Sequence, residues 1–208
     1  MRWTKAANAG LLFVLLAVPL FIPALQPWPW YLLAPLAAFA AVVAAVPPLR
    51  RGVGWLRVGR LDVRVLAATA ALIAVSSAAL AVWFTLARPD VANLASQIPR
   101  VGPAGLALAG AVFALGNAAM EEAVFRGVLQ DALEAEWGRW WAAGVQGVAF
   151  GVIHAQGFPR GPLGMAMASA YGVALGLLRV WSKGLGACVL AHAAADATIF
   201  ALLAGAAG

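Results

Sequence analysis

The sequence predicts an all-α membrane protein, a polytopic bundle of about seven transmembrane helices in a single membrane domain over residues 1–208. Two observations support this fold class. Of the 208 residues, 64% are hydrophobic and only 11% are charged, whereas a soluble domain carries about 25% charged residues. The apolar runs are continuous and about twenty residues long, as in membrane-spanning helices, and lack the alternating ten-residue pattern of a transmembrane β-barrel.

Seven apolar stretches are expected to form the spans, near residues 8–25, 30–47, 65–87, 104–133, 140–156, 162–181 and 184–206. Prolines separate the first stretches, because proline interrupts the hydrogen bonding of a helix. Tryptophans gather at the span ends, as in the aromatic belt of a membrane interface: Trp28, Trp30, Trp137, Trp140, Trp141 and Trp181. We therefore divide the chain into N-terminal spans with an outer connection (1–103) and a four-helix core (104–208).

The distribution of lysine and arginine predicts a cytoplasmic N-terminus. With this orientation the outer segments hold three basic residues, Arg88, Arg100 and Arg160. The inner segments hold ten, namely Arg2, Lys5, Arg50, Arg51, Arg57, Arg60, Arg64, Arg139, Arg179 and Lys183. Basic residues favour the cytoplasmic side of short membrane loops. The net charge of +6 is therefore attributed to topology and not to nucleic-acid binding. The start of the chain resembles a signal peptide without a clear cleavage site, so we expect a retained first helix.

The last four apolar stretches contain the ionisable side chains Glu121, Glu122, Arg126, His154, His192 and Asp196. Each formal charge at mid-membrane costs about 2.5–3.5 kcal/mol, so such residues normally face the bundle interior and mark a functional site. A packing ion pair would explain Glu122 and Arg126, which are spaced i,i+4 on one helix face. It would not explain two histidines and a further carboxylate.

The spacing of these residues predicts that they converge. If the chain turns near Trp137–Gly138, Glu121 and His154 both lie about 24 Å from the turn and therefore at one depth. His192 lies well inside its own span, and Asp196 follows one helical turn later on the same face. Three helices thus bring carboxylates and imidazoles together inside the membrane.

Such a group of side chains can hydrolyse a peptide bond. Glu121 can take a proton from water as a general base, and His154 can hold that water. His192 can donate to the developing oxyanion, and Asp196 can orient His192 or, if protonated, donate a second hydrogen bond. Zinc is an alternative, because Glu121, His154 and His192 are three plausible ligands. The His-Glu-x-x-His motif of many zinc proteases is missing, and the preferred mechanism uses no cofactor.

Three motifs occur in order on successive apolar helices: Glu121-Glu122-x-x-x-Arg126, Phe150-x-x-x-His154 and His192-x-x-x-Asp196. Together they resemble the CAAX-protease and bacteriocin-processing (CPBP) family of intramembrane endopeptidases, over roughly residues 104–206. The resemblance implies that the four-helix core is catalytic, that Glu121 and His154 activate water, and that Glu122 and Arg126 support them. It also implies an oxyanion site at His192 and position 196. The family often has asparagine at position 196, whereas an aspartate there can donate only when protonated.

The resemblance implies a protease in the lipid bilayer, acting on a membrane-anchored or exported protein. We expect a bacterial plasma membrane and a site that opens outward, because His154 lies near the outer end of its span. One alternative is a non-proteolytic membrane scaffold or immunity protein. Another is a proton-coupled transporter, since intramembrane carboxylates and histidines also relay protons. The chain shows no internal repeat of the kind common in transporters.

Overall fold

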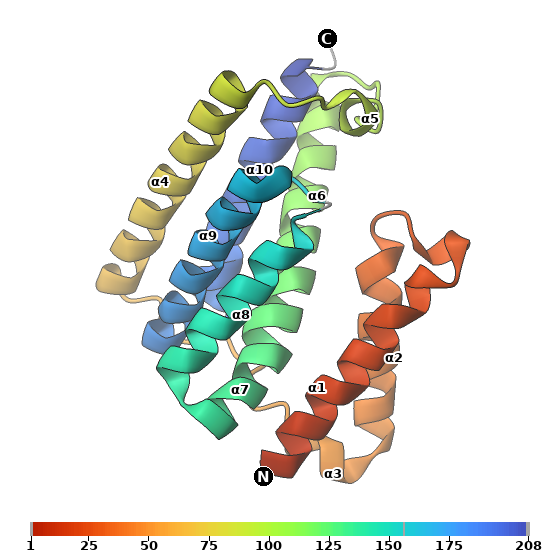
Figure 1. Ribbon diagram of the computed structural model, residues 1–208, viewed down its shortest axis with the longest axis vertical. Coiled ribbons are helices and arrows are strands. Elements are labelled where there is room, and N and C mark those ends of the chain that lie inside the picture. Colours follow the sequence, from red (N-terminus) through yellow and green to blue (C-terminus); the bar gives the residue numbers. More distant parts are fainter. Residues whose placement is uncertain (1, 156, 207–208) are drawn as a thin grey trace.

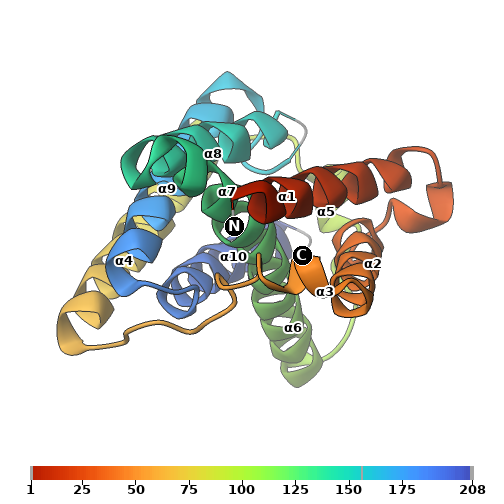
Figure 2. The ribbon, with the colours of Figure 1, turned by 90° about the horizontal axis from the view of Figure 1, so that it is seen from below.

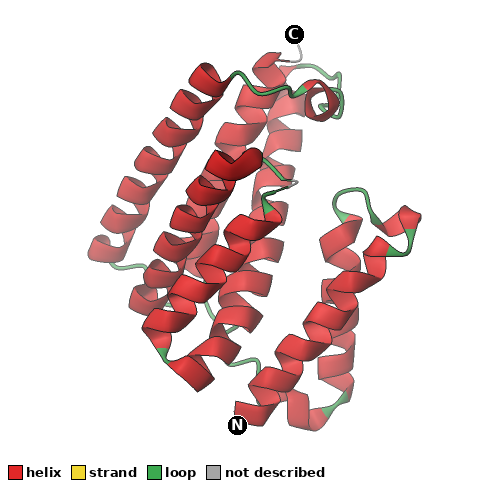
Figure 3. Cartoon of the chain, in the orientation of Figure 1, coloured by secondary structure: helices red, strands yellow, loops and turns green. Residues whose placement is uncertain are grey.

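The computed structural model describes residues 2–155 and 157–206, and these residues form helices and connecting loops without a strand (Figures 1 and 3). The predicted all-α bundle is confirmed. Four residues of the expected domain lie outside the described residues, namely 1, 156 and 207–208. Of these, residue 156 belongs to the expected fifth span.

Ten α-helices and one π-helical segment position the site within these described residues. Their order is α1 (Arg2–Ala17), α2 (Trp30–Ala45), α3 (Pro47–Arg50), α4 (Val63–Ala87), α5 (Ala92–Ala95), α6 (Pro103–Glu122), the π-helical segment (Ala123–Leu129), α7 (Gln130–Trp137), α8 (Arg139–Ile153), α9 (Gly161–Ser182) and α10 (Gly186–Ala206). Short 3-10 turns follow α1 at Val18–Leu20 and Pro23–Leu25.

Local sequence explains several helix ends. The carboxylate of Asp62 caps α4 by accepting hydrogen bonds from the backbone amides of Arg64 and Val65, both at 3.1 Å, which satisfies amides that have no helical partner. Gly138 has a φ of 81°, a value that glycine adopts without the steric cost of a Cβ atom. It separates α7 from α8, so the turn predicted near Trp137–Gly138 is confirmed.

Five helical stretches among the described residues are long and apolar enough to cross a membrane: Arg2–Leu20, Val63–Ala87, Pro103–Trp137, Gly161–Ser182 and Gly186–Ala206. The expected spans 30–47 and 140–156 are shorter helices of 16 and 15 residues, below the roughly 20 residues that a full crossing needs. The first helix runs from Arg2 to Ala17, whereas the sequence predicted a span over 8–25. It ends earlier than predicted because the chain passes into proline-containing 3-10 turns.

The helices form a core with a separate N-terminal hairpin (Figure 1). In the core, α10 packs against α6 and α4, while α8 packs along α9. The hairpin of α1 and α2 lies beside this core and touches it mainly through α1 against α7 and the π-helical segment. Figure 2 shows the same separation from below, with α1 and α2 flanking one side of α6. The start of α1 and the end of α10 lie at opposite ends of the bundle in Figure 1.

Glycines allow α8 and α9 to approach closely. A Cβ atom on Gly147 would lie 2.5 Å from the backbone nitrogen of Val173, and one on Gly172 would lie 2.9 Å from the Cα atom of Gly147. Small residues at such contacts are typical of membrane helix packing. The close contact places Phe150, near the end of α8, beside the centre of the bundle.

A charged cluster joins the N-terminal hairpin to the core at the end of the bundle where the N-terminus lies. Asp131 of α7 pairs with Lys5 of α1 at 2.9 Å and with Arg179 of α9 at 3.3 Å. Arg179 also pairs with Glu134 at 2.8 Å. These ion pairs link α1, α7 and α9, and they lie apart from the polar residues of the predicted site.

Candidate active site

The two adjacent glutamates lie where one long helix changes its winding. Glu121 and Glu122 are the last residues of α6, and the π-helical segment follows directly. Short π-helical stretches are frequent at functional sites. This segment contains Arg126, the last residue of the first sequence motif. The periodicity of the sequence could not distinguish the π-helical segment from an ordinary α-helix.

Glu122 is the central acceptor of a buried network. Its Oε1 atom accepts from Nη1 of Arg126 at 2.8 Å and from Nδ1 of His192 at 2.7 Å. Both Glu122 and Arg126 are fully buried. Arg126 also donates through Nη2 to the backbone carbonyl of Gly172 at 3.3 Å, and its guanidinium carbon lies 4.4 Å from the ring centroid of Phe150. These contacts offset part of the cost of removing both charges from water.

The contact with Glu122 fixes the orientation of His192. The sequence suggested Asp196 for this role, but Nδ1 of His192 donates its hydrogen bond to Glu122. Nε2 faces Oε2 of Glu121 at 3.6 Å and Oδ1 of Asp196 at 3.8 Å. Both distances exceed a direct hydrogen bond, and a water or substrate oxygen can bridge polar groups so spaced.

His154 directly follows the last residue of α8, in agreement with its expected place near the end of its apolar stretch. The helix ends at Ile153, because the chain tightens into i,i+3 hydrogen bonds and then enters a loop. Nδ1 of His154 lies 2.8 Å from the carbonyl oxygen of Phe150, which can only accept, so Nδ1 carries the proton and Nε2 keeps a free lone pair. The Phe150 ring centroid lies 4.6 Å from the ring of His154 and 5.6 Å from that of His192.

Two polar residues that sequence reasoning missed complete the group. Asn117 donates through Nδ2 to Oδ2 of Asp196 at 3.1 Å. The hydroxyl of Tyr31 donates to Oδ1 of Asn117 at 3.4 Å. Asn117 precedes Glu121 by four residues, and this i,i+4 spacing on one helix face could have identified it. No sequence signal connected Tyr31, far away in α2, to the site.

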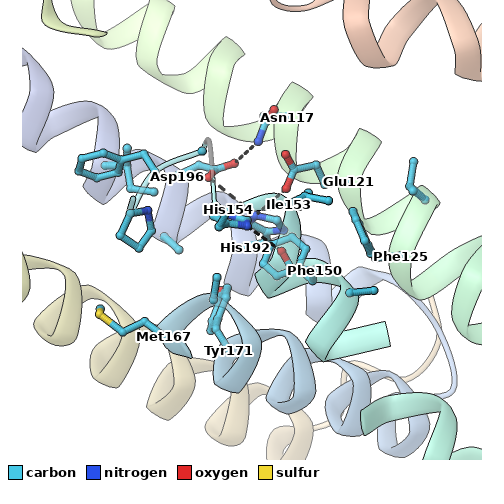
Figure 4. Close-up of a pocket in the computed structure, with 18 of the residues that line it drawn as sticks. Asn117, Glu121, Phe125, Phe150, Ile153, His154, Met167, Tyr171, His192 and Asp196 are labelled. Atoms are coloured by element: carbon cyan, nitrogen blue, oxygen red, sulfur yellow. Dashed lines mark hydrogen bonds and ion pairs between the residues drawn. The ribbon is translucent and has the colours of Figure 1, made fainter. Parts of the chain in front are cut away.

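These side chains line one large cavity (Figure 4) of about 1100 Å³. Its polar part holds Asn117, Glu121, His154, His192 and Asp196. Most of the remaining wall is apolar and comes from both parts of the molecule, including Phe13, Leu20, Val75, Leu80, Met167 and Ala174. The cavity therefore lies between the N-terminal hairpin and the core, and it joins a small polar centre to an extended apolar surface.

The predicted residues thus fall into two groups. Glu121, His154, His192 and Asp196 line the cavity, whereas Glu122 and Arg126 are buried behind His192. Glu121 is 9% exposed, while Glu122 is 0% exposed, so only the first of the adjacent glutamates can meet a molecule in the cavity. The site can supply a proton acceptor, a free imidazole nitrogen and an oriented second imidazole.

A zinc site requires three side chains that share one ion. In the part of the chain that the structure describes, no three His, Cys, Asp or Glu side chains form a group that could hold a metal. The Nδ1 atoms of His154 and His192 bind Phe150 and Glu122, which leaves Nε2 of each ring as the nitrogen that can meet a bound molecule. The choice between a glutamate mechanism and a metal-dependent one therefore stays a prediction.

Comparison with known proteins gives a match within the C-terminal half of the chain. Residues 103–198 match the protein-family model described as type II CAAX prenyl endopeptidase Rce1-like. This match confirms the resemblance to CPBP proteases drawn from the three motifs, and all six predicted site residues lie within it. It supports a protease that is integral to the membrane. No curated protein and no solved structure matches the chain.

Proposed function

We propose that the protein is an intramembrane endopeptidase with a glutamate-activated water. The premise is the match of residues 103–198, called here the Rce1-like segment, to the Rce1-like family model. The observation that carries the proposal is the shared cavity of Glu121, His154 and His192, which three different helical elements supply. A general base, a second water ligand and an oxyanion donor are the groups that peptide hydrolysis requires.

In the first step, Glu121 and Nε2 of His154 hold a water at the polar end of the cavity. The carboxylate of Glu121 takes a proton as the water oxygen attacks the peptide carbonyl carbon. The resulting oxyanion accepts a hydrogen bond from Nε2 of His192, whose Nδ1 donates to Glu122. A ring that donates from both nitrogens is an imidazolium, and the carboxylate of Glu122 balances its charge.

In the second step, the tetrahedral intermediate collapses and the carbon–nitrogen bond breaks. The proton held by Glu121 passes to the leaving amine, which restores the carboxylate of Glu121 for the next cycle. Phe150 lies against both imidazoles and keeps each ring in place between the two steps. The mechanism thus needs no group beyond the side chains of this chain and one water.

The cavity supports a substrate with an apolar anchor beside the bond to be cut. Its walls are mainly aliphatic and aromatic side chains from α1, α2, α4 and α9. Such walls suit a lipid chain or the end of a transmembrane helix better than a soluble polypeptide. We therefore propose a membrane-anchored or exported protein as the substrate class.

Purified protein in proteoliposomes should cleave a quenched fluorescent peptide that carries an apolar C-terminal anchor. Two probes are compared, one ending in an S-farnesyl cysteine and one in a single transmembrane helix. The His154→Gln variant should lose about a hundredfold or more in rate, because glutamine lacks the imidazole nitrogen that holds the water. The Ser77→Ala variant should keep full activity, since Ser77 bonds Thr198 away from the cavity. No cleavage of either probe by the unaltered protein would refute the proposal.

A chelator tests the metal-free form of the mechanism on the same sample. Prolonged treatment with 1,10-phenanthroline, followed by removal of the chelator, should leave the cleavage rate unchanged. Metal analysis of the active sample should find less than one equivalent of zinc per chain. Loss of activity on chelation that zinc restores would replace the glutamate mechanism by a metal-dependent one.

The loop after His154 is proposed to face the outside. In a Cys188→Ala background, which removes the single native cysteine, Gly157→Cys should react with a membrane-impermeant maleimide added to intact cells. The reason is the excess of basic residues in the opposite loops. Labelling only after the cytoplasmic side is exposed would reverse the proposed orientation.

A further inference from the structure

The mechanism above leaves two hydrogen bonds unused, and both lie beside the oxyanion donor. Asn117 and Asp196 are 6% and 5% exposed, so neither can exchange its partner freely with water. The amide of Asn117 donates to Oδ2 of Asp196 at 3.1 Å, and its oxygen accepts from the hydroxyl of Tyr31 at 3.4 Å. In Figure 4 Asn117 and Asp196 point toward each other above His192.

This arrangement determines which oxygen of Asp196 faces the chemistry. Because Oδ2 accepts from Asn117, the other oxygen, Oδ1, is turned to Nε2 of His192 at 3.8 Å. A proton on Asp196 is then favoured on Oδ1, because Oδ2 already accepts from Asn117. A protonated Asp196 can therefore donate a hydrogen bond to the same oxyanion as Nε2 of His192. An ionised Asp196 stabilises the positive charge on the ring of His192.

The amide of Asn117 is itself held in one orientation. An asparagine can exchange its oxygen and nitrogen by rotating about its terminal bond, and its partners decide the outcome. The Tyr31 hydroxyl donates to Oδ1 of Asn117, and the Asp196 carboxylate accepts from Nδ2. Together these partners favour the orientation in which Nδ2 faces Asp196. Tyr31 belongs to α2, so the N-terminal hairpin contributes to the site through this contact.

We propose that Asn117, held by Tyr31, is a positioning residue that fixes Asp196 with its Oδ1 atom beside Nε2 of His192, on the oxyanion side of the cavity. The proposal rests on the proposed peptidase function for its kinetic consequence. It extends the site beyond residues 103–198, because Tyr31 lies outside the Rce1-like segment.

The kinetic test is a double-mutant cycle between Asn117→Ala and Asp196→Ala, using the anchored fluorescent probes. Alone, Asn117→Ala should lower kcat about ten- to a hundredfold, the effect of losing one hydrogen bond to a charged group, with little change in KM. In the Asp196→Ala background the same substitution should have no further effect, because Asn117 acts through Asp196. Tyr31→Phe should lower kcat in the same direction by less. Additive effects of the two alanine variants would overturn the proposal.

A second readout does not depend on activity. The chain contains only two histidines, so protein labelled with ¹⁵N-histidine gives ring signals from His154 and His192 alone, assigned with His154→Gln. In nanodiscs, Asn117→Ala and Tyr31→Phe should shift the ring signals of His192 more than those of His154. Ser77→Ala should shift neither. Unchanged His192 signals in both variants would overturn the positioning role even if neither probe is cleaved, whereas failure to cleave refutes only the peptidase.

Discussion

Replacing Glu121 by glutamine should lower the rate of probe cleavage by about a hundredfold to ten-thousandfold, the contribution of a general base. Glutamine has nearly the same shape, but its amide cannot take a proton from water. Three carboxylates surround His192. Glu122 pairs with Arg126 and Asp196 accepts from Asn117, whereas Glu121 lines the cavity and faces Nε2 of His192 at 3.6 Å. Its removal reduces like-charge repulsion, so we expect thermal unfolding at an unchanged or higher temperature.

Single-turnover cleavage and thermal unfolding should be measured on the same preparation of the Glu121→Gln variant. Glu134→Gln is the matched control, because it makes the same chemical change in an ion pair with Arg179 outside the cavity. We expect that control to cleave at the rate of the unaltered protein. A Glu121→Gln variant that keeps more than about a tenth of the rate would exclude Glu121 as the general base.

Replacing Arg126 by methionine should destabilise the protein by about 3–5 kcal/mol, the usual cost of leaving one partner of a buried ion pair unpaired. Arg126 is fully buried, and its Nη1 atom is the cationic partner of Glu122 at 2.8 Å. Methionine occupies a similar volume but leaves the carboxylate of Glu122 without that charge. Equilibrium unfolding in mixed detergent and SDS micelles measures the loss.

The double variant Glu122→Leu/Arg126→Met separates stability from chemistry. It removes both charges together, and apolar replacement of a whole buried ion pair is often neutral or stabilising. We expect it to recover most of the lost unfolding free energy. Cleavage should be lost, because His192 no longer has the acceptor that orients its Nδ1 atom. An Arg126→Met variant within about 1 kcal/mol of the unaltered protein would contradict the assignment of Arg126 to this pair.

Sequence reasoning predicted the fold well because its signals are strong in a membrane protein. Continuous apolar runs predicted the helices. A glycine between two tryptophan-containing segments predicted the turn at Gly138, which separates α7 from α8. It overestimated the spans 30–47 and 140–156, because apolar composition does not reveal where a short helix ends. It also could not place the N-terminal hairpin, which touches the core through few elements.

For the site, charge in an apolar context identified the residues but not their partners. Glu121, His154, His192 and Asp196 line one cavity, as their spacing suggested. The pairing of Glu122 with His192 depends on how α6 and α10 are rotated against each other, which a one-dimensional spacing does not contain. Asn117 and Tyr31 are uncharged and common in helices, so the sequence did not mark them as site residues. Their contacts with each other and with Asp196 place them there.

The π-helical segment has a consequence for how the two halves of one long helix face their neighbours. A π turn accommodates one additional residue, and each residue of an α-helix advances the side chains by about 100° around the axis. Before the segment, Glu122 faces His192 of α10; after it, Asp131 faces Lys5 and Arg179. The extra residue thus sets the angular phase between the two halves. Deleting one residue from Ala123–Leu129 would restore a regular α-helix and rotate either Glu122 away from His192 or Asp131 away from Lys5 and Arg179. The contacts of the polar centre and those of the charged cluster therefore both depend on the π-helical segment.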